Sequence, residues 1–282
     1  MGLKQKLAER RALLVPGAAN ALTARIIEDL GFEAIYLTGA GLANTSLGVP
    51  DIGLVTMTEL VQATAAISAA TRLPLIVDGD TGFGNELNVV RTVRALERAG
   101  AAAIQLEDQV FPKKCGHFEG KAVIPAAEMV AKIRAAAEAR HSRDLLLIAR
   151  TDARAIEGLD AAIERAARYA EAGADVTFVE APQSVEELAA IPRRLPLPQV
   201  ANMVFGGKTP VLGQKQLAAM GFSLVLYANA ALQASVLAMQ EVLAALRDDG
   251  SLARVANRLA SFEERQRIVR KGEWDKLEKG KG

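Results

Sequence analysis

The sequence of 282 residues predicts a (β/α)8 TIM barrel with a C-terminal helical extension, and three observations support this fold class. Eight short apolar runs alternate with longer amphipathic stretches, as in a chain of strand–helix units. Several of the amphipathic stretches end in Gly, which favours the left-handed conformation that closes a helix. A barrel of this kind uses about 250 residues, so the chain has room for a barrel and a further helical segment.

The eight apolar runs read as strands that are buried on both faces. They show no clean alternation of polar and apolar residues, which is typical of parallel strands covered by helices. We expect these strands at Leu13–Val15, Ala34–Leu37, Leu75–Val77, Ala103–Leu106, Leu145–Ala149, Val176–Val179, Gln199–Ala201 and Leu224–Tyr227.

Helices are expected between these strands, and glycine marks the end of several of them. Gly31, Gly100, Gly173 and Gly221 each stand at the expected C′ position, with a strand a few residues later. A doubly wound open sheet is the alternative, but it would more often carry a glycine-rich phosphate turn after its first strand, and residues 16–19 do not form one. The clearest helical patterns are Asn88–Ala99, Ala126–Ala139, Asp160–Ala172 and Lys215–Met220.

Composition excludes several classes of protein. The 34 Lys and Arg residues against 33 Asp and Glu residues leave a net charge of +1, which argues against partners such as nucleic acid or a membrane surface. One cysteine cannot form an intrachain disulfide, and one cysteine with two histidines is little material for a structural zinc site. The N-terminus has no signal-peptide pattern and no apolar run reaches about 18 residues, so we expect a soluble cytoplasmic protein.

Polar residues follow five successive strands, from the third to the seventh. In a TIM barrel the chemistry lies at the C-terminal ends of the strands, so these residues are predicted to share one rim. A single polar residue after a strand is usually a turn residue, but that explanation is poor for five in succession. The rim residues are Asp78, Asp80, Glu107, Asp108, Arg150, Asp152, Glu180 and Asn202.

The rim residues suggest metal-assisted chemistry on an anion. Asp78, Asp80, Glu107 and Asp108 are hard oxygen donors with no histidine nearby in sequence, which suits Mg²⁺ or Mn²⁺ better than zinc. Arg150 could grip a substrate carboxylate or phosphate with two hydrogen bonds. A metal ion and an arginine together favour an anionic substrate whose developing negative charge they stabilise.

A loop of about a dozen residues, 111–122, follows the fourth strand and is long for a compact domain. Its Cys115 lies among cations and beside His117, where a thiol ionises more easily. The competing interpretation is a buried cysteine that acts as a small hydrophobe. Lys113 and Lys114 could hold an anion or could be solvated loop charges.

These motifs together resemble the isocitrate lyase/phosphoenolpyruvate mutase superfamily, in its lyase branch. The resemblance covers roughly residues 10–250 and is most specific in the loop Lys113-Lys114-Cys115-Gly116-His117. It implies a Mg²⁺-dependent barrel enzyme that cleaves a small 2-hydroxy acid by retro-aldol chemistry. One product would be a 2-oxo acid such as pyruvate, and the other a carboxylate that must take up a proton.

The resemblance also implies a role for each motif residue. Asp78 would bind the metal, and Asp51, Asp80, Glu107 and His117 would act in its water shell or hold the site. Thr38, Gly39 and Ala40 would bind the 2-oxo acid end of the substrate. The other implied roles are Tyr36 as base, Cys115 as proton donor, Arg150 on the oxyanion, Lys113 and Gly116 in the signature loop, and Glu180 and Asn202 on the other carboxylate.

The sequence departs from methylisocitrate lyases of this branch in ways that bear on the substrate. Those enzymes carry Ser and Gly where Thr38 and Ala40 stand, and a Thr-Glu pair where Met203 and Val204 follow Asn202. They also place an arginine for a third carboxylate where this chain has Gln233. The sequence therefore favours a 2-alkylmalate or 2,3-dimethylmalate over methylisocitrate.

Several other functions remain open at this stage. Decarboxylation or hydrolysis of oxaloacetate needs the same metal-bound enolate, and a phosphonate-forming mutase shares the fold. A barrel that only binds a metabolite is a further alternative, whereas a Schiff-base aldolase is disfavoured because none of the eight runs contains a lysine. We expect a barrel domain at 1–250 and a C-terminal helix and tail at 251–282, and the resemblance implies a homodimer or homotetramer that exchanges C-terminal helices.

Overall fold

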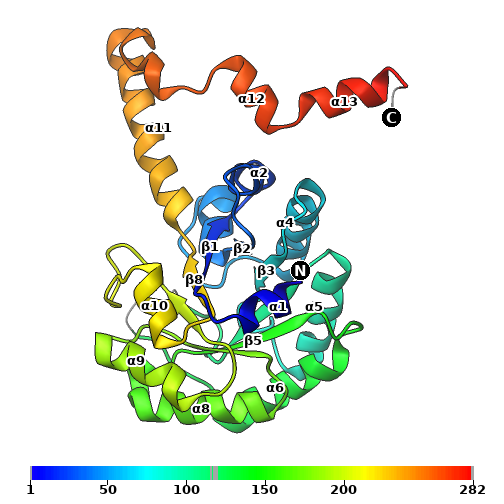
Figure 1. The fold of residues 1–282 in the computed structure, drawn as a ribbon, viewed down its shortest axis with the longest axis vertical. Helices are drawn as coiled ribbons and strands as arrows, with labels where there is room; N and C mark the ends of the chain where they lie inside the picture. The colour runs from blue at the N-terminus through cyan, green and yellow to red at the C-terminus, as the bar shows by residue number, and fades with distance from the viewer. Residues whose placement is uncertain (1, 115, 117–119, 281–282) are drawn as a thin grey trace.

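The computed structural model describes residues 2–114, 116 and 120–280. Its eight strands form one parallel sheet in the order β6-β5-β4-β3-β2-β1-β8-β7. Because β1 pairs with both β2 and β8, the first and last strands lie together and the sheet curls into a barrel (Figure 1). The strands are β1 (Leu13–Ala18), β2 (Ile35–Leu37), β3 (Leu75–Asp78), β4 (Ala103–Glu107), β5 (Leu146–Thr151), β6 (Val176–Val179), β7 (Val200–Asn202) and β8 (Leu224–Tyr227).

The barrel closes between its edge strands β6 and β7 along a thin seam. Thr177 and Gln199 form an isolated parallel bridge there. The Thr177 N–H donates to the Pro198 carbonyl at 3.1 Å, and the Gln199 side chain donates to the Thr177 hydroxyl at 2.6 Å. The predicted (β/α)8 barrel and its eight strands are therefore confirmed.

Helices follow the strands and cover the outside of the barrel. Gly31, Gly100, Gly173 and Gly221, at the ends of α2, α5, α8 and α10, have positive φ angles of 79°, 99°, 114° and 100°, as the sequence predicts. No helix in the described part of the chain is both long enough and apolar enough to cross a membrane. The helices are α1 (Leu3–Ala8), α2 (Ala21–Asp29), α3 (Gly39–Leu42), the π-helix η1 (Ala43–Leu47), α4 (Met57–Ala70), α5 (Glu86–Arg98), α6 (Ala126–Ala139), α7 (Arg154–Glu157), α8 (Leu159–Glu171), α9 (Val185–Arg194), α10 (Gln214–Met220), α11 (Ala230–Asp249), the 3-10 helix η2 (Ala253–Arg258), α12 (Phe262–Ile268) and α13 (Lys271–Glu278).

Apolar side chains fill the barrel interior as well as the space between strands and helices. The interior cluster includes Val15, Ile76 and Ile148, which are all but inaccessible to solvent. Leu3 and Leu7 of α1 belong to the same cluster, so this short helix closes the N-terminal end of the barrel. The C-terminal ends of the strands are left for polar side chains, as in other barrels of this class.

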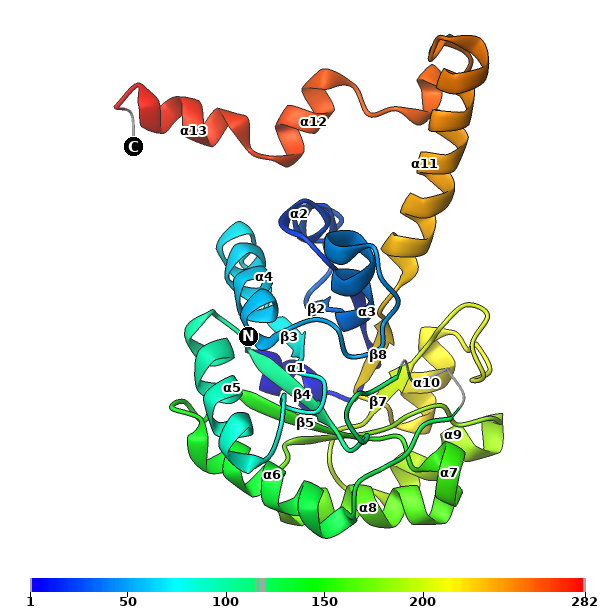
Figure 2. The same cartoon turned by 180° about the vertical axis from the view of Figure 1, so that it is seen from behind.

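Helices α11, η2, α12 and α13 form an arm, residues 230–280, that extends away from the barrel (Figures 1 and 2). Helix α12 returns to α2, where Arg267 pairs with Asp29 at 2.6 Å. Helix α11 leaves Leu237 and Leu243 69% and 61% exposed, which is unusual for large apolar side chains on a long helix. The predicted C-terminal helical extension is thus present.

Candidate active site

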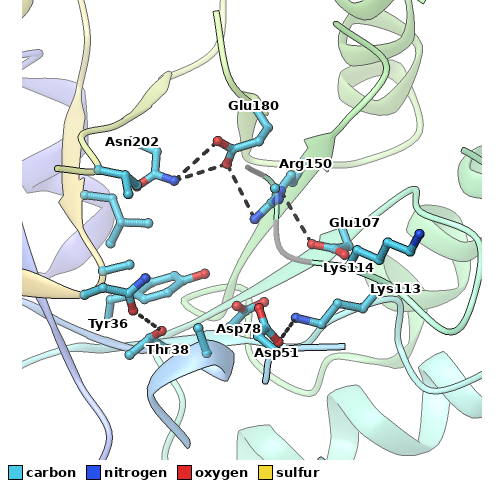
Figure 3. Close-up of a pocket in the computed structure, with 16 residues that line it drawn as sticks. Tyr36, Thr38, Asp51, Asp78, Glu107, Lys113, Lys114, Arg150, Glu180 and Asn202 are labelled. Atoms are coloured by element: carbon cyan, nitrogen blue, oxygen red, sulfur yellow. Dashed lines mark hydrogen bonds and ion pairs between the residues drawn. The ribbon is translucent and has the colours of Figure 1, made fainter. Parts of the chain in front are cut away.

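A pocket opens at the C-terminal ends of the strands, and most of the predicted site residues line it (Figure 3). It encloses a cavity of about 40 Å³. Its walls come from the ends of the strands and from the loop after β4. The predicted residues that line it are Tyr36, Thr38, Ala40, Asp51, Asp78, Glu107, Lys113, Gly116, Arg150, Glu180 and Asn202.

The remaining predicted residues divide into two groups. Gly39 and Asp80 lie directly behind the lining: the Gly39 N–H donates to Asp78 at 3.4 Å, and Asp80 lies 2.9 Å from the Lys113 ammonium. Cys115 and His117 lie outside the described residues. The roles predicted for these two side chains therefore stay predictions.

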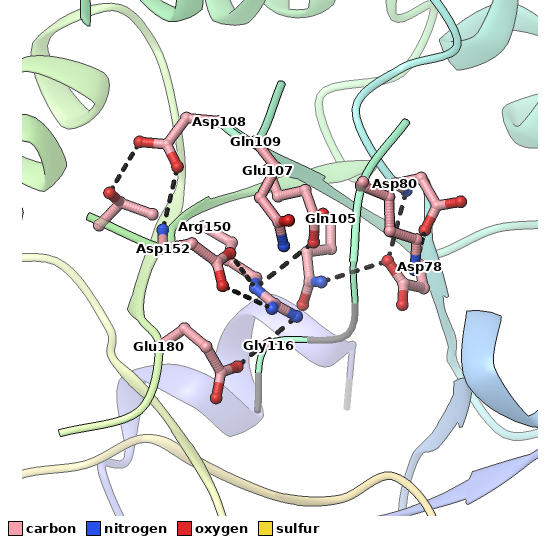
Figure 4. Close-up of polar contacts among 12 residues, drawn as sticks. Asp78, Asp80, Gln105, Glu107, Asp108, Gln109, Gly116, Arg150, Asp152 and Glu180 are labelled. Atoms are coloured by element: carbon pink, nitrogen blue, oxygen red, sulfur yellow. Dashed lines mark hydrogen bonds and ion pairs between the residues drawn. The ribbon is translucent and has the colours of Figure 1, made fainter. Parts of the chain in front are cut away.

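One side of the pocket is dominated by carboxylates, and we call Asp51, Asp78, Asp80, Glu107 and Lys113 the acid half. The Lys113 ammonium lies 2.5 Å from Asp51 and 2.9 Å from Asp80, and its side chain is almost fully buried. Asp78 accepts hydrogen bonds at 3.3 Å from the Asp80 N–H and from the Gln105 amide (Figure 4). The turn after β3 thus directs two aspartates toward a lysine from the loop after β4.

The acid half holds more negative charge than its lysine balances. The pKa of Asp80 is raised to about 7, chiefly by burial, with the charges of Asp78 and Asp51 adding to the rise and Lys113 opposing it. Burial also raises the pKa of Glu107 well above its usual range. Atom Oε1 of Glu107 accepts no hydrogen bond from any residue that the structure describes.

These properties fit a hydrated divalent cation. The described residues contain no cluster of three or more Asp, Glu, His or Cys side chains arranged to hold a metal ion directly. Mg²⁺ does not need such a cluster, because it usually keeps several waters and takes only one or two carboxylates. A crowded group of buried carboxylates with an unpaired oxygen is the donor set that such an ion would stabilise.

The other side of the pocket is organised around Arg150, and we call Arg150, Asp152, Lys121 and Glu180 the arginine half. Arg150 donates from Nε and Nη2 to Asp152 at 2.9 and 3.1 Å. Its guanidinium also lies 3.5 Å from Glu180 and 5.3 Å from the centre of the Phe178 ring. The surrounding carboxylates raise the pKa of Arg150 in spite of its burial, so it carries a permanent charge.

Lys121 and Asp152 were not predicted as site residues, although both occur in motifs noted from the sequence. The Lys121 ammonium lies 2.7 Å from Asp152, and both side chains are almost completely buried. It also donates to the Gly116 carbonyl at 2.5 Å. The position of Asp152 two residues after a rim arginine was a signal, but its contact with Lys121 across 31 residues of sequence could not be predicted from spacing.

Glycine is required at position 116 because the backbone there approaches Arg150 closely. A Cβ atom on Gly116 would lie 2.4 Å from Arg150 Nη2 and 2.9 Å from Glu180 Cγ. Such distances are far shorter than van der Waals contact, so any other residue would push the arginine half apart. Gly116 of the signature loop is therefore packed directly against the arginine.

Glu180 and Asn202 form the edge of the pocket at the seam of the barrel. The Asn202 amide donates to the two Glu180 oxygens at 3.4 and 3.2 Å. Asn202 Oδ1 is buried and accepts no hydrogen bond from the residues described. A buried acceptor of this kind is normally satisfied, so it marks a place for a ligand or water with a donor group.

Thr38 and Tyr36 lie on the β2 side of the pocket. The Thr38 hydroxyl donates to the Asn229 side chain at 3.2 Å and accepts from the Gly41 N–H at 3.2 Å. Tyr36 is buried, and burial raises the pKa of its phenol, with the charge of Asp78 adding to the effect. Tyr36 is therefore protonated at neutral pH.

A second, apolar cavity of about 110 Å³ adjoins the polar pocket. The two share Val204 and Asn229 in their linings, so they are contiguous. No charged side chain is found among the described residues that line the second cavity. They are Met203, Val204, Phe205, Val211, Tyr227, Asn229, Ala230 and Gln233.

The fold and the rim define a TIM barrel whose polar pocket combines buried carboxylates with a charged arginine, as in barrel enzymes with a site at the C-terminal ends of the strands. Comparison with known proteins agrees, because the phosphoenolpyruvate phosphomutase family model matches residues 3–247. The chain belongs to the phosphoenolpyruvate mutase/isocitrate lyase superfamily, in its lyase branch, and its relatives there are carbon–carbon lyases. The resemblance inferred from the motifs is confirmed.

Two curated relatives illustrate the similarity. The chain is 45% identical over 262 residues to the 2,3-dimethylmalate lyase of Eubacterium barkeri, covering 93% of this chain and 91% of that protein. It is 47% identical over 257 residues to the 2-methylisocitrate lyase of Aeropyrum pernix, covering 91% of this chain and 82% of that one.

Solved structures show the same architecture. A 2,3-dimethylmalate lyase structure has a TM-score of 0.94 at 33% identity and covers 99% of this chain and 94% of its own. An oxaloacetate acetylhydrolase bound to 3,3-difluorooxalacetate has a TM-score of 0.93 at 32% identity, with coverages of 99% and 95%. A phosphonopyruvate hydrolase complex with oxalate and Mg²⁺ has a TM-score of 0.88 at 33% identity, with coverages of 98% and 96%.

Proposed function

We propose that this enzyme is a Mg²⁺-dependent lyase that cleaves a 2-alkylmalate or 2,3-dialkylmalate to a 2-oxo acid such as pyruvate and a carboxylate. The observation that carries this proposal is the uncharged second cavity beside the polar pocket. A substrate with two carboxylates and alkyl substituents matches a polar pocket joined to an apolar one. A third carboxylate against Val204 and Phe205 would find no cation among the described residues that line the second cavity, and burying an unpaired charge is costly.

The chain's own residues supply binding and charge balance for this reaction. Arg150 would neutralise the oxyanion that develops at C2, and its raised pKa keeps it charged at every working pH. Thr38, Gly39 and Ala40 would bind the 2-oxo acid end, and Asn202 with Glu180 the other carboxylate. Asn202 Oδ1 and Nδ2 face this edge, where the amide already donates to Glu180.

Asp78 would hold the Mg²⁺ ion directly, with Asp51, Asp80 and Glu107 acting through its waters. When bound, the ion supplies positive charge to the substrate oxygens and to the enolate that forms. The same positive charge would offset Asp78 beside Tyr36 and lower the pKa of that phenol, because Asp78 raises it now. Tyr36 is thus suited to accept the C2 hydroxyl proton only in the loaded enzyme.

The protons balance through two side chains. Tyr36, once it has released its own phenol proton to solvent, takes the proton from the C2 hydroxyl, the C2–C3 bond breaks, and C2 becomes the carbonyl carbon of the 2-oxo acid. C3 then needs a proton, which we assign to the Cys115 thiol, with Lys113 and His117 in the same loop. A thiol of lowered pKa is an adequate acid for this transfer.

A substrate panel tests the proposal. The purified protein is incubated with Mg²⁺ and 2-methylmalate, 2,3-dimethylmalate or methylisocitrate, and pyruvate is followed with a coupled dehydrogenase. We expect kcat/KM for 2,3-dimethylmalate to exceed that for methylisocitrate by about 10-fold or more. A preference for methylisocitrate would overturn the assignment, and EDTA-treated enzyme serves as the control for metal dependence.

Oxaloacetate hydrolysis is a second candidate, favoured by the similarity to the oxaloacetate acetylhydrolase structure. It would yield oxalate and acetate, whereas decarboxylation would yield pyruvate and CO₂, so the products separate the two. Cys115→Ser separates the lyase from a decarboxylase: carbon–carbon cleavage that ends in protonation of C3 should collapse, while a decarboxylase could survive. A phosphonate-forming mutase would instead interconvert phosphonopyruvate and phosphoenolpyruvate.

We also propose that the arm, residues 230–280, is exchanged between copies of this chain in a homo-oligomer. A groove of about 780 Å³ lies between α2 and α11 and is lined by exposed apolar side chains such as Leu22, Ile26 and Met239. Leu237 and Leu243 of α11 are themselves exposed. Helix α11 of a second copy has the apolar surface that would fill this groove, and sedimentation velocity would reveal the association.

A further inference from the structure

The geometry points to Lys121 as a positioning residue for the reaction, because it links the Gly116 backbone to the Asp152–Arg150 pair. The Lys121 ammonium donates to the Gly116 carbonyl at 2.5 Å and lies 2.7 Å from Asp152 Oδ1. That same carboxylate receives both hydrogen bonds from Arg150, at 2.9 and 3.1 Å. One buried ammonium therefore connects the loop after β4 with the arginine of β5.

The frame that holds Asp152 is rigid. Its backbone N–H donates to Asp108 at 2.9 Å, and Asp108 also accepts from the hydroxyls of Thr151 at 2.7 Å and Tyr169 at 2.8 Å (Figure 4). Asp108 is fully buried behind the rim, and Asp152 has no exposed surface. Lys121 thus attaches the loop to a fixed part of the barrel.

Lys121 also affects how strongly Asp152 competes for Arg150. Three carboxylates, Glu107, Asp152 and Glu180, lie within 3.5 Å of the guanidinium. Lys121 shares the negative charge of Asp152, so less of it is available to draw Arg150 away from a substrate anion. Without Lys121, Asp152 would be a buried carboxylate whose sole remaining basic partner, among the described residues, is the arginine that the reaction needs.

The position of the Gly116 backbone matters because Gly116 and Arg150 are in contact. A Cβ on Gly116 would lie 2.4 Å from Arg150 Nη2, so a small displacement of this backbone changes the space beside the guanidinium. Gly116 is also joined by its peptide bond to Cys115, the proposed proton donor. Misplacement by about 1 Å at a reacting centre can cost about 100-fold in rate. Lys121 would therefore act on turnover more than on substrate binding.

Lys121→Met in the full-length enzyme tests this role, with the activity proposed above as readout. We expect kcat to fall about 100-fold while KM changes less than about 3-fold. Lys121→Arg should recover about 10-fold or more of the loss, since a guanidinium keeps the charge and can donate to both oxygens. Lys6→Met is the matched control, because Lys6 pairs with Glu33 at 2.5 Å far from the rim.

The outcomes are distinct. A Lys121→Met enzyme that loses thermal stability but keeps its kcat, or that loses no more kcat than Lys6→Met, would overturn the inference. If the wild-type enzyme cleaves no acid in the panel, the proposed function fails and the Kd of oxalate with Mg²⁺ decides instead. Oxalate resembles a planar enolate, so Lys121→Met should then weaken its binding about 10-fold, and an unchanged Kd would refute the role.

Discussion

Two buried lysines come from the same loop, but they meet different surroundings: Lys113 lines the pocket, and Lys121 contacts Gly116 and Asp152. Lys113 lies among the carboxylates of the acid half, where burial still raises the pKa of Asp80 to about 7. Lys121 lies in the arginine half, where it and Arg150 lower the pKa of Asp152 even though burial acts to raise it. The acid half is thus short of positive charge, whereas the arginine half is balanced by the chain itself (Figures 3 and 4).

This difference separates two tasks. A group of carboxylates that repel one another is stabilised by a cation from solution, so the acid half is suited to reversible metal binding. A balanced set of ion pairs has less need of an external ion and can hold its groups in place. We therefore expect the acid half to bind a metal ion and the arginine half to hold its side chains in fixed positions.

The largest expected effect comes from the centre of the arginine half. Arg150→Gln should lower kcat about 1000-fold, because it removes the fixed charge that faces the developing oxyanion. Steady-state kinetics with the preferred acid measures the change, and Arg150→Lys should restore only part of the rate since a lysine cannot make both hydrogen bonds to Asp152. A loss of kcat below about 10-fold would contradict the role proposed for Arg150.

The next effect concerns the pH dependence of the acid half. Because Asp80 has a pKa of about 7, Mg²⁺ affinity should rise about 10-fold per pH unit up to pH 7 and then level off. Without metal the sign for stability is opposite: the folded pKa exceeds the ordinary value of 3.8, so this group destabilises the fold as the pH rises from about 4 to about 7.

Isothermal titration calorimetry at several pH values measures this Mg²⁺ affinity. Asp80→Asn is the matched variant, since it keeps the shape of the side chain but has no proton to lose. It should bind Mg²⁺ more weakly and with a flatter pH dependence. A wild-type Mg²⁺ affinity that does not change between pH 6 and pH 8, by contrast, would contradict the expected link between Asp80 ionisation and Mg²⁺ binding.

A smaller effect is expected where the polar pocket meets the apolar cavity. Gln233→Arg would place a cation in the lining of the second cavity and should shift the ratio of kcat/KM toward methylisocitrate by about 10- to 100-fold. The dialkylmalate activity should fall only modestly, because neither half of the polar pocket is altered. Competition between the two acids in one assay gives the ratio directly.

The smallest effect on chemistry should come from the arm. Leu237→Glu together with Leu243→Glu should shift sedimentation toward the single chain, because these exposed leucines would meet a second copy. Turnover should change less than in any rim variant. Leu87→Glu on the barrel helix α5 is the control, since Leu87 is 73% exposed and lies outside the arm. Equal association of both variants would contradict the exchanged arm.

Much of the fold could be predicted because buried parallel strands leave a clear trace in the sequence. Each predicted strand lies within one to three residues of its observed bounds, and the glycines at 31, 100, 173 and 221 mark real helix ends. The rim residues followed from the rule that barrels carry polar groups at one end. For the strands, the helix ends and the rim residues, local sequence patterns were sufficient.

The link between Lys121 and Asp152 could not be predicted, because it joins a loop to a strand end. Loop residues show no periodicity, so nothing in the spacing indicates which side chain turns inward. The same holds for Lys113, whose nearest partner, Asp51, is 62 residues away. The course of the arm was equally hidden, since an apolar helical stripe fits packing on its own barrel or on another copy.

We expect the barrel to open most easily at the seam between β6 and β7. A strand pair joined by a single isolated bridge and a few hydrogen bonds should fluctuate more than the fully paired strands, and its amide protons should exchange first. Glu180 follows β6 and Asn202 ends β7, so opening of the seam would widen the rim at the edge of the apolar cavity. This motion of the barrel wall could admit substrates with alkyl groups of different length without moving the metal site or Arg150.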